Sequence, residues 1–88
     1  MVIIKGLIWD DWNKAHITRH GISPEEVEEI CQGKYEVIES YRKRILVIGK
    51  TKKGKSLALV LSPEDRDLQP FGYGLYYPIT AFEKEVEE

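Results

Sequence analysis

Two histidines near the N-terminus are the first residues whose type and spacing could do chemistry. His16 and His20 lie four positions apart, and Trp12 lies four positions before His16, so a helix would carry all three on one face. A zinc pair uses this spacing, although no third ligand follows at a matching interval. Alternatively, the histidines pack on Trp12 and bond a carbonyl or carboxylate. A third interpretation is proton transfer or phosphate contact, because only histidine titrates near neutral pH without perturbation.

A second chemical feature is the basic tract of residues 42–55. It contains seven cationic residues and no acidic one: Arg42, Lys43, Arg44, Lys50, Lys52, Lys53 and Lys55. Glutamates concentrate in residues 25–29 and 83–88, so the net charge of −2 conceals a polarised molecule. Attraction of a polyanion depends on the local potential rather than on the net charge. The tract therefore predicts a nucleic-acid-binding surface, or else a solvated hairpin whose lysines prevent edge-to-edge aggregation.

The composition predicts that one small domain, residues 1–88, positions these groups. Hydrophobic residues make up 42% and charged residues 32% of the chain, which is typical of a folded globular protein. No apolar stretch approaches the roughly 20 residues of a membrane span. Cys31 is the only cysteine, so no internal disulfide can form, and a cytoplasmic location is the default expectation. We interpret Cys31 as a small buried hydrophobe.

The first 33 residues predict one strand and two helices. Residues 2–9 have strand composition, and Asp10 or Asp11 can cap a short helix that runs to about His20. The second helix begins with Pro24 in its first position and ends at Gly33. Its start combines a capping box, Ser23 with Glu26, and a hydrophobic staple, Ile22 on Val27.

The rest of the chain predicts an antiparallel meander. Strand composition occurs in residues 35–41, 44–50, 56–62 and 73–80, with a hairpin loop at 51–54 and a long loop at 62–74. The second and third of these strands are apolar on both faces, so we expect them to be central, with helices on one side and another layer on the other. Pro78 cannot donate to a ladder, which places its strand at an edge or near its end. Residues 81–88 form a short terminal helix or a frayed acidic tail. The predicted class is α+β, with two N-terminal helices packed on a meander of four to five strands.

Several segments together resemble BrnT-like toxins of type II toxin-antitoxin systems. Trp9-Asp10, Asn13 and the segment 19–26 (RHGISPEE) resemble the opening of that family. The segment 44–51 (RILVIGKT) resembles its arginine-led strand, and 77–81 (YPITA) resembles its last strand. The similarity covers about residues 7–82. The family usually has an arginine after the final alanine, where this chain has Phe82.

The resemblance implies a fold akin to RelE-type and barnase-like ribonucleases. It further implies cleavage of RNA that needs no metal or cofactor and that inhibits translation. It also implies neutralisation by a cognate antitoxin protein. The catalytic residues that it implies are His20, Arg19 and Arg44, with His16 or Tyr77 as a second proton carrier. The departure at Phe82 keeps open an alternative, a non-catalytic module that binds nucleic acid or protein.

Overall fold

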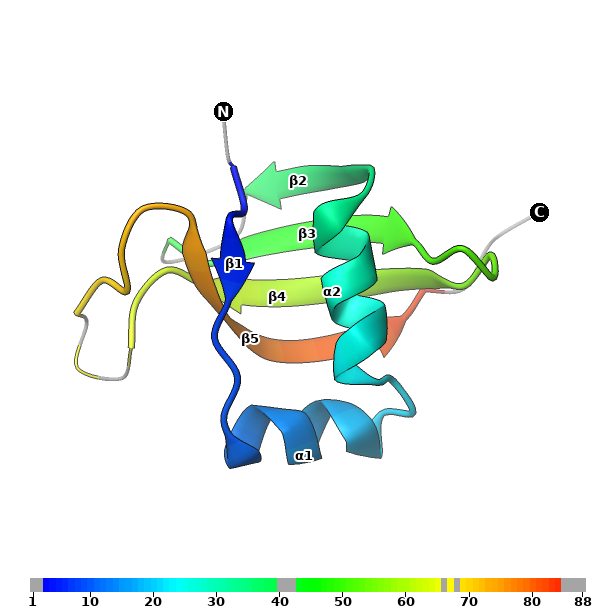
Figure 1. Ribbon diagram of the computed structural model, residues 1–88, viewed down its shortest axis with the longest axis horizontal. Coiled ribbons are helices and arrows are strands. Elements are labelled where there is room, and N and C mark those ends of the chain that lie inside the picture. Colours follow the sequence, from blue (N-terminus) through cyan, green and yellow to red (C-terminus); the bar gives the residue numbers. More distant parts are fainter. Residues whose placement is uncertain (1–2, 40–42, 66, 68, 85–88) are drawn as a thin grey trace.

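The computed structural model describes residues 3–39, 43–65, 67 and 69–84. Two helices, α1 (Asp11–Arg19) and α2 (Pro24–Gln32), precede most of the sheet. The strands are β1 (Gly6–Leu7), β2 (Tyr35–Glu39), β3 (Ile45–Lys50), β4 (Ser56–Ser62) and β5 (Leu75–Glu83). They form one sheet in the order β1-β5-β4-β3-β2, shown in Figure 1. The predicted α+β class is confirmed. The sheet is mixed, however, because β1 pairs parallel to β5.

Both helices begin with reciprocal caps that satisfy backbone amides of the first turn. The Asp10 carboxylate accepts from the Asn13 amide at 2.9 Å, and the Asn13 side chain accepts from the Asp10 amide at 2.8 Å. Ser23 and Glu26 form the equivalent pair at the start of α2, as predicted. Gly33 caps the end of α2.

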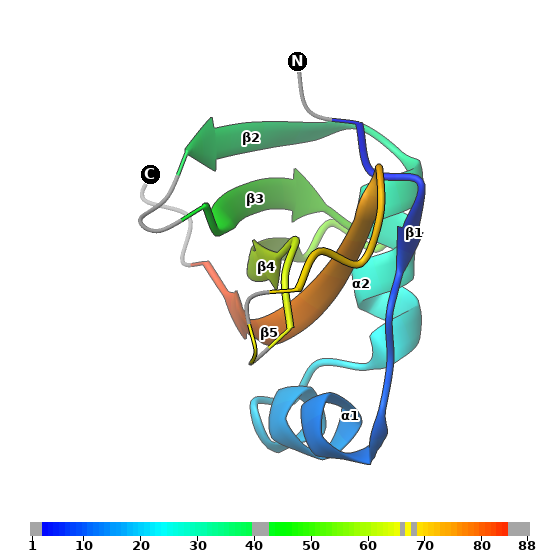
Figure 2. The same cartoon turned by 90° about the vertical axis from the view of Figure 1, so that its left-hand side faces the viewer.

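One face of the sheet is covered by α2 (Figures 1 and 2). Val47, Leu57, Leu59 and Leu61 are buried completely in the core that this face forms with the two helices. The approach of α2 is close at Gly49, where an added Cβ would lie 2.5 Å from the Ile30 side chain. Glycine is therefore required at this position for the observed packing.

No described element covers the opposite face of the sheet, which we call the open face. Figure 2 shows α2 on one side of strands β2 to β5 and no labelled element on the other side. Leu46, Ile48 and Val60, which alternate with the buried residues of β3 and β4, are only partly buried. The second covering layer that the sequence led us to expect is absent among the described residues.

Pro78 determines where β1 stops pairing. Gly6 pairs with Leu75 and Leu7 with Tyr76, and the Ile8 amide donates to the Tyr76 carbonyl at 2.8 Å. The next bond of a parallel ladder would run from the amide of residue 78 to the Ile8 carbonyl, but proline has no N–H. The side-chain amide of Asn13 donates to that carbonyl instead, at 3.0 Å. Asn13 is completely buried in this role.

Three further predicted details were wrong. The first strand is two residues long rather than eight, and Pro78 ends its ladder on the C-terminal side. The strand of Pro78 lies between β1 and β4, and proline is tolerated there because β1 has ended and the β4–β5 register shifts at Val60/Leu61. Residues 81–83 continue β5 rather than starting a helix or a frayed tail.

Val2, Ser40, Tyr41 and residues 85–88 lie outside the described residues. In the part of the chain that is described, no helix has the length and apolar character needed to cross a membrane.

Candidate active site

A pocket of about 600 Å³ opens at the end of the sheet where β3 begins and β4 ends. The start of α1, the loop after β4 and the first half of β5 contribute its walls. Its apolar and aromatic lining consists of Ile8, Trp12, Phe71, Tyr77 and Ile79. The polar residues that line it, among those that the structure describes, are Asp10, Arg44, Ser62, Glu64, Asp65 and Asp67. The pocket thus combines flat hydrophobic surfaces with groups that can exchange protons or bind anions.

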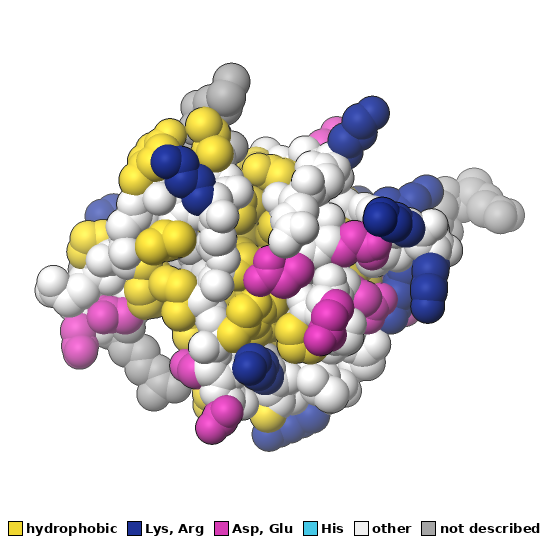
Figure 3. All heavy atoms as spheres, viewed as in Figure 1, with side chains coloured by type: hydrophobic (Ala, Val, Ile, Leu, Met, Phe, Trp, Pro, Cys, Tyr) yellow, Lys and Arg dark blue, Asp and Glu magenta, His cyan; other side chains and the backbone are white. Residues whose placement is uncertain are grey.

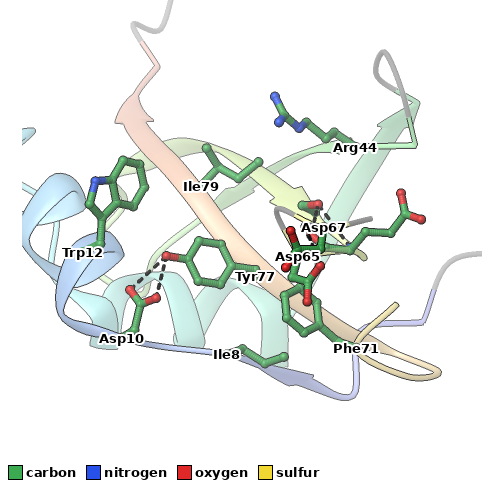
Figure 4. Close-up of a pocket in the computed structure, with 11 residues that line it drawn as sticks. Ile8, Asp10, Trp12, Arg44, Asp65, Asp67, Phe71, Tyr77 and Ile79 are labelled. Carbon is green, nitrogen blue, oxygen red and sulfur yellow. Dashed lines mark hydrogen bonds between the residues drawn. The ribbon is translucent and has the colours of Figure 1, made fainter. Parts of the chain in front are cut away.

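Asp10 and Tyr77 form the central polar contact of the pocket. The Tyr77 hydroxyl lies 2.9 Å from each Asp10 carboxylate oxygen and donates to this carboxylate (Figure 4). Asp10 is held in place because the same carboxylate caps α1. The ring of Tyr77 stacks on Phe71, with 6.1 Å between the ring centroids. The pair therefore joins a helix start and a strand that are 67 positions apart.

Arg44 is the cationic residue among the described residues that line the pocket. It immediately precedes β3, and Figure 4 shows its guanidinium on the opposite side of the pocket from Trp12. Among the described lining residues, carboxylates outnumber it, but Glu64 also contacts Lys43, whose ammonium lies 3.7 Å away. An arginine fork can bind a phosphate through two parallel hydrogen bonds.

The histidines and Arg19 lie beside the pocket without lining it. His16 stacks on Trp12 with 5.0 Å between ring centroids, and His20 meets His16 edge to face at 5.1 Å. Trp12 itself lines the pocket, so the three rings form a row that leads away from it along α1. Arg19 is exposed in the last turn of α1. Of the predicted catalytic residues, the structure brings Arg44 and Tyr77 into one pocket, and it leaves His16, His20 and Arg19 outside.

The basic tract does not form one surface. Lys43 and Arg44 lie at the pocket end of β3, whereas Lys50, Lys52, Lys53 and Lys55 lie at the other end, in and beside the β3–β4 hairpin. Arg42 lies outside the described residues. Figure 3 shows acidic side chains over α2 next to cationic side chains at this hairpin. Part of the positive charge of the hairpin therefore lies next to acidic side chains of α2.

The contacts between the hairpin and α2 are specific. The Lys55 ammonium lies 3.3 Å from the Glu26 carboxylate and donates to the Gly21 carbonyl at 3.2 Å. The Lys52 amide donates to the Glu29 carboxylate at 3.2 Å. The backbone hydrogen bond from Ser23, followed by the contacts with Lys55, holds the pKa of Glu26 below its usual value despite partial burial. We therefore assign Lys55 a structural contact in addition to any role in binding.

Cys31 and metal chemistry have little support in this geometry. Burial, with a smaller effect of Glu28, raises the pKa of Cys31 to about 12, so the thiol stays protonated at neutral pH. Across the residues that the structure describes, no three His, Cys, Asp or Glu side chains are grouped so that they could hold a metal ion.

Sequence reasoning missed Asp10 and Trp12 as pocket residues. Asp10 was interpreted only as a helix cap, and Trp12 only as a partner of the histidines. The useful indication was present in the chain: Trp9-Asp10 and Tyr77-Pro78 both belong to the segments that resemble the toxin family. Comparison of the chain with protein-family models, curated proteins and solved structures gives no match.

Proposed function

We propose that the protein is a metal-independent endoribonuclease that cuts cytoplasmic RNA and so inhibits translation, in the manner of the BrnT-like toxins that it resembles. The observation that carries the proposal is the pocket in which Arg44 lies together with the Asp10–Tyr77 pair. RNA cleavage without metal needs three things: a proton acceptor, a proton donor and a cation for the phosphate. A carboxylate, a phenol and a guanidinium provide them.

In the proposed reaction, the ribose 2′-oxygen attacks the phosphorus and the bond to the 5′-oxygen breaks. Asp10 takes the proton of the 2′-hydroxyl, and Tyr77 gives its phenolic proton to the leaving 5′-oxygen. The proton on Asp10 then passes to Tyr77 across their hydrogen bond, which restores both groups. Arg44 stabilises the additional charge on the phosphate oxygens. The products are a 2′,3′-cyclic phosphate and a 5′-hydroxyl.

The remaining lining residues suit the bases rather than the phosphates. Trp12 is 48% exposed and lines the pocket, so part of its indole is accessible for stacking. Asp65 and Asp67 can accept hydrogen bonds from base N–H groups, whereas they would repel phosphate. We therefore orient the RNA with its scissile phosphate toward Arg44 and an unpaired base toward Trp12.

A cleavage assay with chelator tests this proposal. Single-stranded RNA is incubated with the wild type in EDTA, and the new ends are analysed for 2′,3′-cyclic phosphate. Asp10→Asn is the informative variant, because asparagine still caps a helix but is a much weaker proton acceptor. We expect cleavage by the wild type and a loss of about 100-fold or more in Asp10→Asn. Intact RNA with the wild type would refute the proposal.

The variant His20→Ala tests which residue carries the protons in this activity. In our proposal His20 is not the proton carrier, because it lies at the end of the ring row, outside the pocket. His20→Ala should therefore retain most of the cleavage rate. If it instead abolishes cleavage while Asp10→Asn does not, the imidazole is the proton carrier that the family resemblance implies.

A non-catalytic binding module is the second candidate function. The observation that favours it is that three of the residues implied as catalytic by the resemblance, His16, His20 and Arg19, are not among the described residues that line the pocket. Such a module binds RNA, or an antitoxin-like protein, without cutting it. Gel-shift measurements in EDTA that show salt-dependent binding of intact RNA, unaffected by Asp10→Asn, would select this candidate.

A further inference from the structure

The pocket is continuous with the open face of the sheet. Ser62 and Tyr77 pair across β4 and β5, and both line the pocket. Every second side chain of a strand lies on the same face, so the open face continues along β4 from Ser62 to Val60 and then to Ala58. Leu46 on β3 is the partner of Val60. A ligand that is too long for the pocket can therefore continue along the strands.

Phe82 is a flat hydrophobic side chain on this route. It pairs with Ala58 and is 44% exposed. Ile48, the partner of Ala58 on β3, is partly buried beside it. Aromatic rings bind the bases of single-stranded nucleic acids by stacking, with little preference for sequence. Phe82 therefore offers a stacking surface in addition to that of Trp12 in the pocket.

A row of lysines crosses the far end of the open face. Lys50 pairs with Ser56, and the Lys84 amide donates to the Ser56 carbonyl at 2.8 Å. On the other side of Lys50, the register of β2 with β3 extends to Lys34. All three lysines are exposed, and strand alternation places them on the open face. We call Lys34, Lys50 and Lys84 the lysine row.

The described carboxylates limit where a polyanion can run over this face. Glu36 lies on the open face at the edge strand β2, where it is exposed beside Ile48. Glu83 pairs with Leu57, whose side chain is buried in the core, so Glu83 belongs to the covered side. Carboxylates also line the pocket around Arg44, which leaves the lysine row as the better place for further phosphates. The favourable route therefore runs over β3, β4 and β5 toward the lysine row.

We propose that the open face binds the continuation of the RNA strand whose scissile phosphate lies at Arg44, with a base on Phe82 and phosphates at the lysine row. This inference rests on the proposed function, because it takes RNA as the ligand of the pocket. The six-residue step from Arg44 to Lys50 spans about 20 Å at 3.3–3.4 Å per residue. A duplex keeps its bases stacked inside and cannot place one on Phe82. The substrate class is therefore an unpaired RNA segment of several nucleotides, within the range of about 4–16 that single-strand-binding domains cover.

The experiment uses fluorescence anisotropy with labelled RNA that carries 2′-O-methyl groups. Such RNA has no free 2′-hydroxyl and cannot undergo the proposed cleavage, so binding is measured by itself. The probes are an unpaired strand of about 12 nucleotides, the same strand annealed to its complement, and a trinucleotide. Cleavage is measured separately with unmodified RNA. Failure of this inference and failure of the proposed nuclease activity are therefore distinguishable.

Two variants, each with a matched control, test the two parts of the surface. The lysine-row variant changes Lys34, Lys50 and Lys84 to Ala. Its control removes the same charge at exposed positions outside the open face, namely Lys5, Lys14 and Lys52. Phe82→Leu keeps an apolar side chain but removes the flat ring, and Tyr73→Leu is its control at another exposed aromatic residue. Circular dichroism checks that all variants fold. Residues 85–88, which include three glutamates, are the same in every protein and do not affect the comparison.

We expect the unpaired strand to bind the wild type at least tenfold more tightly than the trinucleotide or the duplex. The lysine-row variant should lose about tenfold in affinity for this strand, roughly twofold for each lysine. Its plot of log affinity against log salt should become shallower by about 2, because each lost phosphate contact removes about 0.7 from the slope. Phe82→Leu should lose about fivefold or more. Both variants should bind the trinucleotide as the wild type does, because it is too short to reach from the pocket to either feature.

An equal loss in the control lysine variant would overturn the proposal, because attraction would then depend on total charge rather than on the lysine row. Unchanged affinity in the lysine-row variant or in Phe82→Leu would overturn it as well, and so would equal binding of the trinucleotide or no binding of the unpaired strand. Wild-type dimers in sedimentation velocity that Phe82→Leu dissociates would also contradict it, because the occupant of the open face would then be a second copy of this chain.

Discussion

The two faces of the same sheet differ in what their side chains do. On the covered face, Val47 and Leu59 are completely buried against the helices. On the open face, their sequence neighbours Leu46 and Val60 are partly exposed, and the pocket lies at the end of this face. Apolar residues therefore serve stability on one face and, in our account, recognition on the other. The contrast between adjacent residues of one strand provides direct tests.

The largest expected effect separates the two faces by stability. Leu59→Ala removes a completely buried side chain and should lower the free energy of unfolding by about 2–5 kcal/mol. Leu46→Ala removes the same atoms from a partly exposed position and should cost clearly less. Urea denaturation of both variants measures the difference. Equal losses would contradict the assignment of Leu46 to an open face.

The second comparison is between the two ends of β3. Arg44→Ala should reduce kcat/KM for RNA about 10- to 100-fold, because a charge-assisted hydrogen bond contributes about 1.5–3 kcal/mol. Lys50→Ala, at the far end of the same strand, should change kcat/KM by less than about threefold. Initial rates at limiting substrate provide the measurement. A larger effect at Lys50 would mean that the hairpin, not the pocket, binds the reacting phosphate.

The covered face depends on α2. Removing the N-terminal cap of α2 should lower the free energy of unfolding by less than removing a core side chain. Ser23→Ala removes the side-chain acceptor of the Glu26 amide, which should cost about 1 kcal/mol of unfolding free energy. Thr18→Ala is a suitable control, because the Thr18 hydroxyl bonds the Lys14 carbonyl inside a helix and caps nothing. A cost for Ser23→Ala no greater than that of the control would show that the capping box contributes little.

The smallest effect concerns pH. The pKa of Glu26 is lowered in the folded state, mainly by its bond to the Ser23 backbone, so its ionised form favours folding. This contribution is present above the ordinary glutamate pKa of 4.5 and is lost as the pH falls through the lower folded value. Glu26→Gln should therefore be less stable than the wild type at pH 7, and the difference should shrink at pH 3. A difference that is independent of pH would exclude this ionisation as its cause.

Local patterns predicted the helices well because their determinants lie within a few residues. The Ser23–Glu26 capping box, Pro24 and Gly33 all act inside α2, and the structure has them as predicted. The same holds for β4, whose bounds match the prediction. Parallel pairing of β1 with β5 joins segments about 69 positions apart, and a pattern within a few residues cannot predict such a pairing.

The pocket was only partly predictable for the same reason. Arg44 and Tyr77 were identified from the family resemblance, and they do line one pocket. The role of Asp10 depends on Tyr77 reaching it from β5, and these two residues are 67 positions apart in the sequence. The basic tract illustrates the opposite error, because residues close in sequence are separated by the length of β3.

The central claim is that the Asp10–Tyr77 pair in the pocket transfers the protons of RNA cleavage. Its most direct test is the rate of 2′,3′-cyclic phosphate formation in EDTA for Tyr77→Phe, with Tyr73→Phe as the control. Tyr73 is an exposed tyrosine that contacts Lys5 and does not line the pocket. We predict a loss of about 100-fold or more in Tyr77→Phe and a rate close to wild type in Tyr73→Phe. Equal rates in wild type and Tyr77→Phe would contradict the account.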